Sequence, residues 1–157
     1  MLLIHVLLSL IGIVAGIVVL RGLLIGRQLD GWTAVFLGST ILTSVSGFPV
    51  APFGFDPPRA VGVLSLLLLA IACAALYLFR LTGAWRWIYV GSAVAALYLN
   101  VFVLVAQAFQ KLPPLKALAP TQSEPPFLVA QVVVLAAFVV LGALAARRFH
   151  PGIGKGP

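Results

Sequence analysis

Five long apolar runs constrain this chain more than any other feature of its sequence. They cover Leu2–Leu20, Trp32–Val50, Val61–Phe79, Trp87–Phe109 and Phe127–Ala146. A helix that crosses a bilayer needs roughly 20 apolar residues. Charged residues make up only 8% of the chain, whereas soluble domains carry about 25%. We therefore predict an all-α integral membrane bundle of five transmembrane helices, with residues 1–157 forming a single transmembrane domain. The second run is the least apolar, because it carries several serines and threonines.

The basic residues predict the orientation of this bundle. They stand in ones and twos at the ends of the runs rather than clustered on one face, which argues against nucleic acid as a partner. If all five runs cross the membrane, one side holds Arg21, Arg27, Arg80, Arg86, Arg147, Arg148 and Lys155, and the other holds Arg59, Lys111 and Lys116. By the positive-inside rule, we expect the N-terminus outside and the C-terminus inside.

The fourth run carries the only asparagine of the chain, Asn100, within an otherwise apolar segment. At about 100 degrees per residue, one helical stripe gathers polar and small side chains. That stripe holds Tyr89, Ala93, Ala96, Asn100, Val103, Gln107, Gln110 and Lys111, and the second run offers a matching stripe of Ser39, Thr40, Thr43 and Gly47. Small and hydroxyl-bearing faces let membrane helices approach and hydrogen-bond one another. The GxxxG pairs of the first run, at positions 12 and 16 and at 22 and 26, indicate close contact with a neighbouring helix or with a second copy.

The predicted topology brings most of the versatile side chains to the outer half of the bundle, beneath two proline-rich loops. Polar groups that converge in this way are typical of a ligand site. The candidate binding residues are His5, Asp56, Arg59, Asn100, Gln107, Gln110, Lys111, Glu124 and Gln131. Two interpretations of Asn100 and Gln107 remain open: they clamp helices together, or they line a small polar pocket.

Several functions are compatible with this pattern. We expect a non-catalytic protein that either binds a small amphipathic ligand, such as a lipid or quinone, in an outer-side pocket, or acts as an accessory subunit of a membrane complex. One alternative is an oligomeric channel or transporter for a small solute, lined by the hydroxyls of the second run. Another is a membrane enzyme with His5 as base and Glu124 or Asp56 as its orienting carboxylate. No metal or cofactor motif is present, and the expected partners are membrane lipids, a membrane protein or a second copy.

Two local patterns predict helix ends. Asp56 before Pro57, and Ser123 or Glu124 before Pro125, suit N-caps followed by prolines in a first helical turn. In the segment AWRWIY, the side chains of Trp85, Trp87 and Tyr89 are expected to form an aromatic belt at the inner interface.

The segments AWRWIYV, ALYLNVFVLVAQAFQK and LAPTQSEPPF resemble those of small multi-pass membrane proteins of bacteria. This resemblance covers about the last half of the chain. It implies a location in the bacterial inner membrane, and it implies no activity, because none is assigned to that group.

Overall fold

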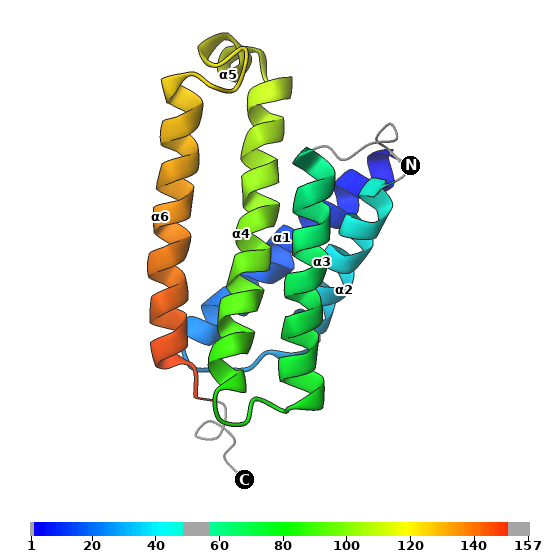
Figure 1. The fold of residues 1–157 in the computed structure, drawn as a ribbon, viewed down its shortest axis with the longest axis vertical. Coiled ribbons are helices and arrows are strands. Elements are labelled where there is room, and N and C mark those ends of the chain that lie inside the picture. Colours follow the sequence, from blue (N-terminus) through cyan, green and yellow to red (C-terminus); the bar gives the residue numbers. More distant parts are fainter. Residues whose placement is uncertain (1, 49–56, 151–157) are drawn as a thin grey trace.

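The protein is all-helical in the residues that this computed structural model describes, 2–48 and 57–150. In this part of the chain, the helices are α1 (Leu2–Leu24), α2 (Asp30–Gly47), α3 (Pro57–Cys73) with a π-helical end (Ala74–Leu78), α4 (Trp85–Lys111), α5 (Pro113–Leu118) and α6 (Pro125–Arg148). The five long helices alternate in direction along the chain, α1 crosses obliquely behind α4, and the short α5 lies above the ends of α4 and α6 (Figure 1).

Within residues 2–48 and 57–150, four helices are long and apolar enough to cross a membrane: Leu3–Leu24, Pro57–Leu78, Trp85–Lys111 and Pro125–Arg148. They correspond to the first, third, fourth and fifth predicted runs. The first is longer than predicted only at its C-terminal end, the third only at its N-terminal end, and the other two at both ends. The second predicted run becomes α2, which is only 18 residues long and carries the hydroxyl groups noted above. The all-α membrane bundle is thus confirmed with four candidate spans.

The core lies where α1, α2, α3 and α4 meet, and small residues let these helices approach. At Gly16 of α1, an added Cβ atom would lie 2.5 Å from Leu97 Cδ1 and 3.0 Å from the Phe36 ring. Ala93 and Ala96 of the predicted α4 stripe are buried in the same core. The glycines at positions 12 and 16 therefore let α1 contact neighbouring helices of the same chain, which is one of the two interpretations of this GxxxG pair.

The third helix departs from the single regular helix predicted for 61–79. It begins before the apolar run, at Pro57, as the capping pattern predicted, but its last turn widens into a π-helix, in which the Phe79 amide donates to the Ala74 carbonyl oxygen at 3.0 Å. Arg80 and Leu81 then adopt left-handed backbone conformations, with φ of 48° and 59°. The chain reverses here, and the Phe79 ring stacks on Trp85 with centroids 3.9 Å apart at the start of α4.

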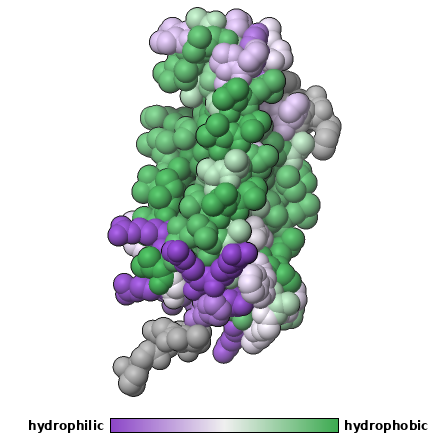
Figure 2. All heavy atoms as spheres, turned by 90° about the vertical axis from the view of Figure 1, so that its left-hand side faces the viewer, coloured by the Kyte–Doolittle hydropathy of each residue, from purple (hydrophilic) through white to green (hydrophobic). Residues whose placement is uncertain are grey.

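Hydrophilic side chains gather at the two ends of the molecule, and an apolar band separates them (Figure 2). The strongly hydrophilic end, which we call the basic end, carries the arginines near the ends of α1, α3 and α6 and at the start of α2 and α4. Within the described ranges these are Arg21, Arg27, Arg80, Arg86, Arg147 and Arg148. The opposite end, which carries α5, is the α5 end. The six arginines that were predicted to share one side do lie at one end of the bundle, and the seventh basic residue of that prediction, Lys155, lies outside the described residues.

The predicted aromatic belt is correct only in part. Trp87 is 49% exposed near the basic end, and the Arg86 guanidinium lies 4.4 Å from the centre of its ring. Tyr89, however, is 1% exposed and packs against Phe149, with ring centroids 6.1 Å apart. The prediction was wrong for Tyr89 because this residue belongs to the α4 stripe that faces the core.

Candidate functional site

A polar junction joins α1, α2 and α4 in the middle of the bundle. Asn100 Nδ2 donates a hydrogen bond to Thr40 Oγ1 at 3.2 Å, and both side chains are buried. Gly12 closes the junction from α1, because a Cβ atom there would lie 3.1 Å from Thr40 Oγ1 and 3.2 Å from Ser39 Oγ. The predicted pairing of the α4 stripe with the hydroxyl stripe of helix two is confirmed, while sequence spacing did not identify Gly12 as the third partner.

Between this junction and the α5 end, the α4 face that carries Asn100 becomes exposed, and this part of the face includes Leu104, which the predicted stripe did not contain. Leu104 is 42% exposed, and Gln107 and Lys111 are also exposed. Seven residues of α-helix separate Asn100 from Gln107, a rise of about 10 Å. Asn100 and Gln107, which share one stripe and were considered together from sequence, therefore occupy different environments. We call Leu104, Gln107 and Lys111 the exposed stripe.

His5 fastens the first turns of α1 to the last turns of α2. Its Nδ1 lies 2.9 Å from Ser46 Oγ, in a hydrogen bond. Gly47 lies beside the same ring, since a Cβ atom there would be 3.3 Å from His5 Cε1. His5 is therefore a contact between α1 and α2 at the α5 end, and it is separate from the Asn100 junction.

Gln131 connects α6 to α4. Its Nε2 donates to the Phe102 carbonyl oxygen at 3.2 Å, and the side chain is 8% exposed. Its Oε1 atom and the Thr43 hydroxyl have no hydrogen-bond partner in the described part of the structure. Gln131 thus acts as a contact between two helices and retains one unused acceptor.

A second polar network surrounds α5. Gln110 donates to the Gln122 side chain at 3.2 Å, and Gln122 donates to the Ala106 carbonyl oxygen at 2.8 Å. The Glu124 carboxylate accepts hydrogen bonds from the Thr121 hydroxyl at 2.7 Å and from the Thr121 and Ser123 amides, both at 3.1 Å. The Thr121 hydroxyl, followed by these amides, lowers the pKa of Glu124.

Glu124 occupies the N-cap position of α6, as one of the two predicted choices, and prolines follow it in the first turn. Its side chain makes no capping hydrogen bond to that helix, because the carboxylate turns back to the loop that precedes it. The predicted capping contact is therefore wrong, although the position is right. No sequence signal indicated Gln122, whose left-handed conformation (φ 59°) lets it reach back to α4.

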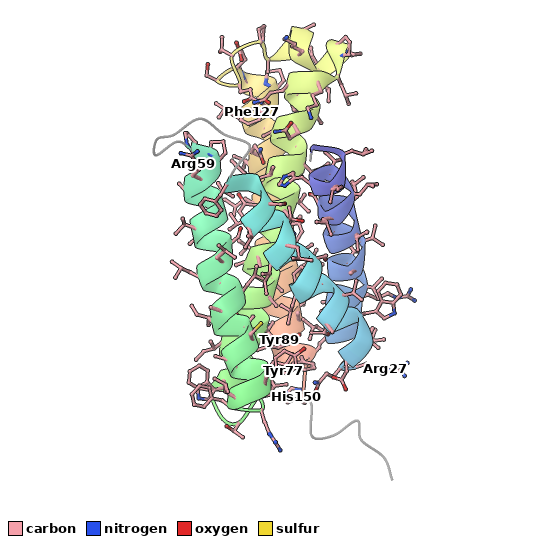
Figure 3. All side chains as sticks on the ribbon, turned by 90° about the vertical axis from the view of Figure 1, so that its right-hand side faces the viewer. Arg27, Arg59, Tyr77, Tyr89, Phe127 and His150 are labelled. Carbon is pink, nitrogen blue, oxygen red and sulfur yellow. The ribbon has the colours of Figure 1, made fainter. Side chains whose placement is uncertain are left out.

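Arg59 lies in the first turn of α3, half-buried. Figure 3 shows it at the opposite end of the bundle from Arg27 and His150. The other predicted residue of this region, Asp56, lies outside the described residues. The α3 helix does begin with the two prolines that its capping pattern predicted.

The polar candidates take part in separate contacts in the described ranges. They fall into the Asn100 junction, the His5 contact, the Gln131 contact, the α5 network and the exposed stripe. A small apolar crevice lies between α1, α2 and α4, and none of the polar candidates lines it; its lining residues are Gly16, Val19, Leu20, Leu23, Phe36, Ala93, Val94 and Leu97. No group of three or more His, Cys, Asp or Glu side chains that could hold a metal ion occurs in residues 2–48 and 57–150.

The helices and their apolar band define an integral membrane protein. Comparison of the chain with protein-family models, curated proteins and solved structures found no match. The functional argument therefore rests on the geometry of this chain alone.

Proposed function

We propose that this protein is a non-catalytic membrane protein of the bacterial inner membrane that binds a lipid or another small amphipathic molecule along the exposed stripe of α4. The observation that carries the proposal is the change from buried to exposed side chains along one face of α4. The face is buried as far as Asn100 and then presents an apolar residue, an amide and an ammonium group to the surface.

The proposal includes α2 as a fifth crossing. Eighteen residues of α-helix span about 27 Å, close to the roughly 30 Å of a hydrocarbon core. The hydroxyls that make α2 less apolar also donate to its own backbone: Thr33 to the Leu29 carbonyl oxygen at 2.8 Å and Ser39 to that of Val35 at 2.6 Å. Because α2 packs between α1 and α3, its polar groups are shielded from lipid, which supports a membrane-spanning position.

The proposed orientation places the basic end inside and the α5 end outside. The arginines at the basic end outnumber the three basic residues found near the α5 end, Arg59, Lys111 and Lys116. This asymmetry supports an outside N-terminus and an inside C-terminus under the positive-inside rule.

The depth of the exposed stripe fits a lipid-like ligand. Gln107 lies about 13 Å from the middle of α4 along the helix axis, near the edge of the hydrocarbon core. A ligand with a polar head could accept hydrogen bonds from Gln107 and Lys111 and place its tail along Leu104. Asn100 lies about two helical turns deeper, and its side chain already donates a hydrogen bond to Thr40. Gln107 is therefore the amide that is accessible to a ligand.

Native mass spectrometry of gently extracted protein tests this function. We expect a retained small molecule of defined mass that is lost in the double variant Gln107→Leu/Lys111→Gln and kept in Lys116→Gln, a matched control on α5 away from the stripe. Asn100→Leu should keep the ligand but lower stability. A ligand retained equally by the double variant, or no retained ligand, would contradict the proposal.

The second candidate, an accessory subunit of a membrane complex, is favoured by the exposure of α6. Among the residues of that helix only Gln131 and Ala145 are buried, so most of its surface is free to meet another protein. The same extraction would then yield a protein partner in fixed stoichiometry. A cysteine at Val133, which is 61% exposed, should crosslink to that partner, whereas a cysteine at Leu67 of α3, which is 58% exposed, should not.

The remaining alternatives gain little support from the geometry. The α2 hydroxyls proposed to line a channel, Ser39, Thr40 and Thr43, are buried against helices of the same chain. The catalytic alternative pairs His5 with Glu124 or Asp56. His5 bonds to Ser46 and Glu124 to Thr121, in separate networks.

A further inference from the structure

At the basic end, several arginines come together where the end of α1 meets the end of α6. Gly26, with a left-handed φ of +74°, lies against the last turn of α6, since a Cβ atom there would be 3.2 Å from the Arg148 carbonyl oxygen. The α1–α2 turn is thereby held on α6, and Arg27 follows directly in the chain. Arg21 lies in the last turn of α1, and Arg147 and Arg148 in that of α6.

These four arginines form a concentration of positive charge, and among the described acidic residues only Asp30, at the start of α2, lies at the same end. All four are exposed, and none forms an ion pair with a described residue. Asp30 accepts a hydrogen bond from Gln28 Nε2 at 2.7 Å and can offset one of the four positive charges, whereas Glu124 lies in the α5 network at the opposite end. Like charges at one place repel, so an anion bound there would be stabilising.

The surroundings specify the kind of anion. The arginines follow directly on apolar helices, and Figure 2 shows the hydrophobic band beginning next to the hydrophilic side chains on the α6 side. The edge of such a band is where the phosphates of a bilayer would lie. Exposed apolar residues such as Ile17 of α1 and Val140 of α6 continue from the arginines into that band. A guanidinium group binds phosphate oxygens in a bidentate fork.

We propose that the arginines at positions 21, 27, 147 and 148 form a binding site for an anionic phospholipid with two phosphate groups. Two guanidinium groups then face each phosphate, and the acyl chains lie along the apolar surfaces of α1 and α6. The site is at the opposite end of the bundle from the exposed stripe, so it does not depend on the proposed function. A lipid with one phosphate would use only half of the guanidinium groups.

The test reconstitutes the full chain in phosphatidylcholine nanodiscs that contain either cardiolipin, which has two phosphates, or phosphatidylglycerol at equal total charge. Bound lipid is counted by native mass spectrometry after release from the disc. We expect one tightly retained cardiolipin and about thirtyfold less retention in Arg27→Gln/Arg148→Gln, because each basic residue near an anionic surface contributes about 1 kcal/mol and about 1.4 kcal/mol corresponds to a factor of ten. Arg80→Gln, at the same end but on the α3–α4 connection, is the matched control and should retain cardiolipin fully.

Three results would overturn the proposal. Equal retention of phosphatidylglycerol would indicate attraction to surface charge alone. Undiminished retention in the double variant would place any lipid elsewhere, and an equal loss in Arg80→Gln would remove the local site. Because the substituted side chains are exposed, circular dichroism of each variant should match that of the unchanged protein, and lipid bound at the exposed stripe should remain in all of them.

Discussion

The hydrogen bond between Asn100 and Thr40 can be tested with a double-mutant cycle of Asn100→Leu, Thr40→Val and the combined variant. The two side chains are 3.2 Å apart between Nδ2 and Oγ1 and are 8% and 0% exposed, respectively. They belong to helices that are far apart in sequence, so the bond fixes α4 against α2. Leucine and valine approximate the shapes of the residues that they replace, which limits changes in packing.

The magnitude follows from what each substitution leaves behind. After Asn100→Leu, the Thr40 hydroxyl can turn to its own helix backbone, as Ser39 and Thr33 already do. After Thr40→Val, the Asn100 amide stays buried without this acceptor, and an unsatisfied buried group costs about 1 to 3 kcal/mol. We expect losses of about 1 kcal/mol for Asn100→Leu and about 2 kcal/mol for Thr40→Val. Side-chain hydrogen bonds in membranes average about 0.6 kcal/mol and reach about 1.7, so the coupling energy should be about 1 kcal/mol.

The free energy of unfolding can be measured in mixed micelles titrated with a denaturing detergent, with tryptophan fluorescence as the signal. Gln107→Leu is the matched control, since it removes an amide from the same stripe where the side chain is exposed, and it should leave the unfolding free energy unchanged. If the two substitutions are additive to within about 0.3 to 0.5 kcal/mol, the two groups do not interact and the clamp is refuted. A loss in Gln107→Leu as large as that in Asn100→Leu would refute the distinction between buried and exposed amides.

Three further predictions follow from other parts of the structure. Gly16→Ala should lower stability by about 1 to 3 kcal/mol through overpacking, because its Cβ atom would lie 2.5 Å from Leu97 Cδ1; Gly91→Ala, with no heavy atom within 4 Å, should not, and equal losses in detergent unfolding would contradict the reasoning. The pKa of Glu124 is lowered in the folded protein, so its stabilisation of the loop should be complete at neutral pH and be lost as the pH falls through that lowered pKa; amide exchange in residues 121–124 should show this loss, and Glu124→Gln should abolish the pH step. A cysteine at Ala117, exposed on α5, should react with an impermeant thiol reagent from outside intact cells when the native cysteine is replaced, and labelling only after lysis would reverse the proposed orientation.

Much of the bundle could be predicted from the sequence because membrane helices have a strong signal. Runs of apolar residues predicted the long helices, and prolines marked the starts of α3 and α6, whereas α5 lies within a segment that was predicted to be a proline-rich loop. The pairing of Asn100 with a hydroxyl of helix two was also predictable, because polar and small residues recur at helical spacing on both segments. Such periodicity records which face of a helix meets a neighbour.

Other features depend on the tilt of the helices relative to one another and on the backbone conformation of single residues, and the periodicity of the sequence contains no information on either. Gln107 shares the face of Asn100, yet it is exposed because α1 and α2 do not follow α4 along its whole length. Tyr89 was assigned to the interface by residue type, whereas its position on the buried stripe decided its place. The π-helical turn and the left-handed conformation of Gln122 depend on single backbone hydrogen bonds that no residue pattern in this chain predicts.

The pairing of α2 with α1 has a consequence for biogenesis. A segment as short and as rich in hydroxyls as α2 partitions weakly into lipid by itself, whereas α1 is among the most apolar helices of the chain. The two are joined by a turn of only five residues, 25–29, and they pack against each other along their lengths. We expect the insertion machinery to release them together as a helical hairpin, so that a truncated chain ending after α2 would integrate stably only when Gly12 and Gly16 allow α1 to cover the polar face.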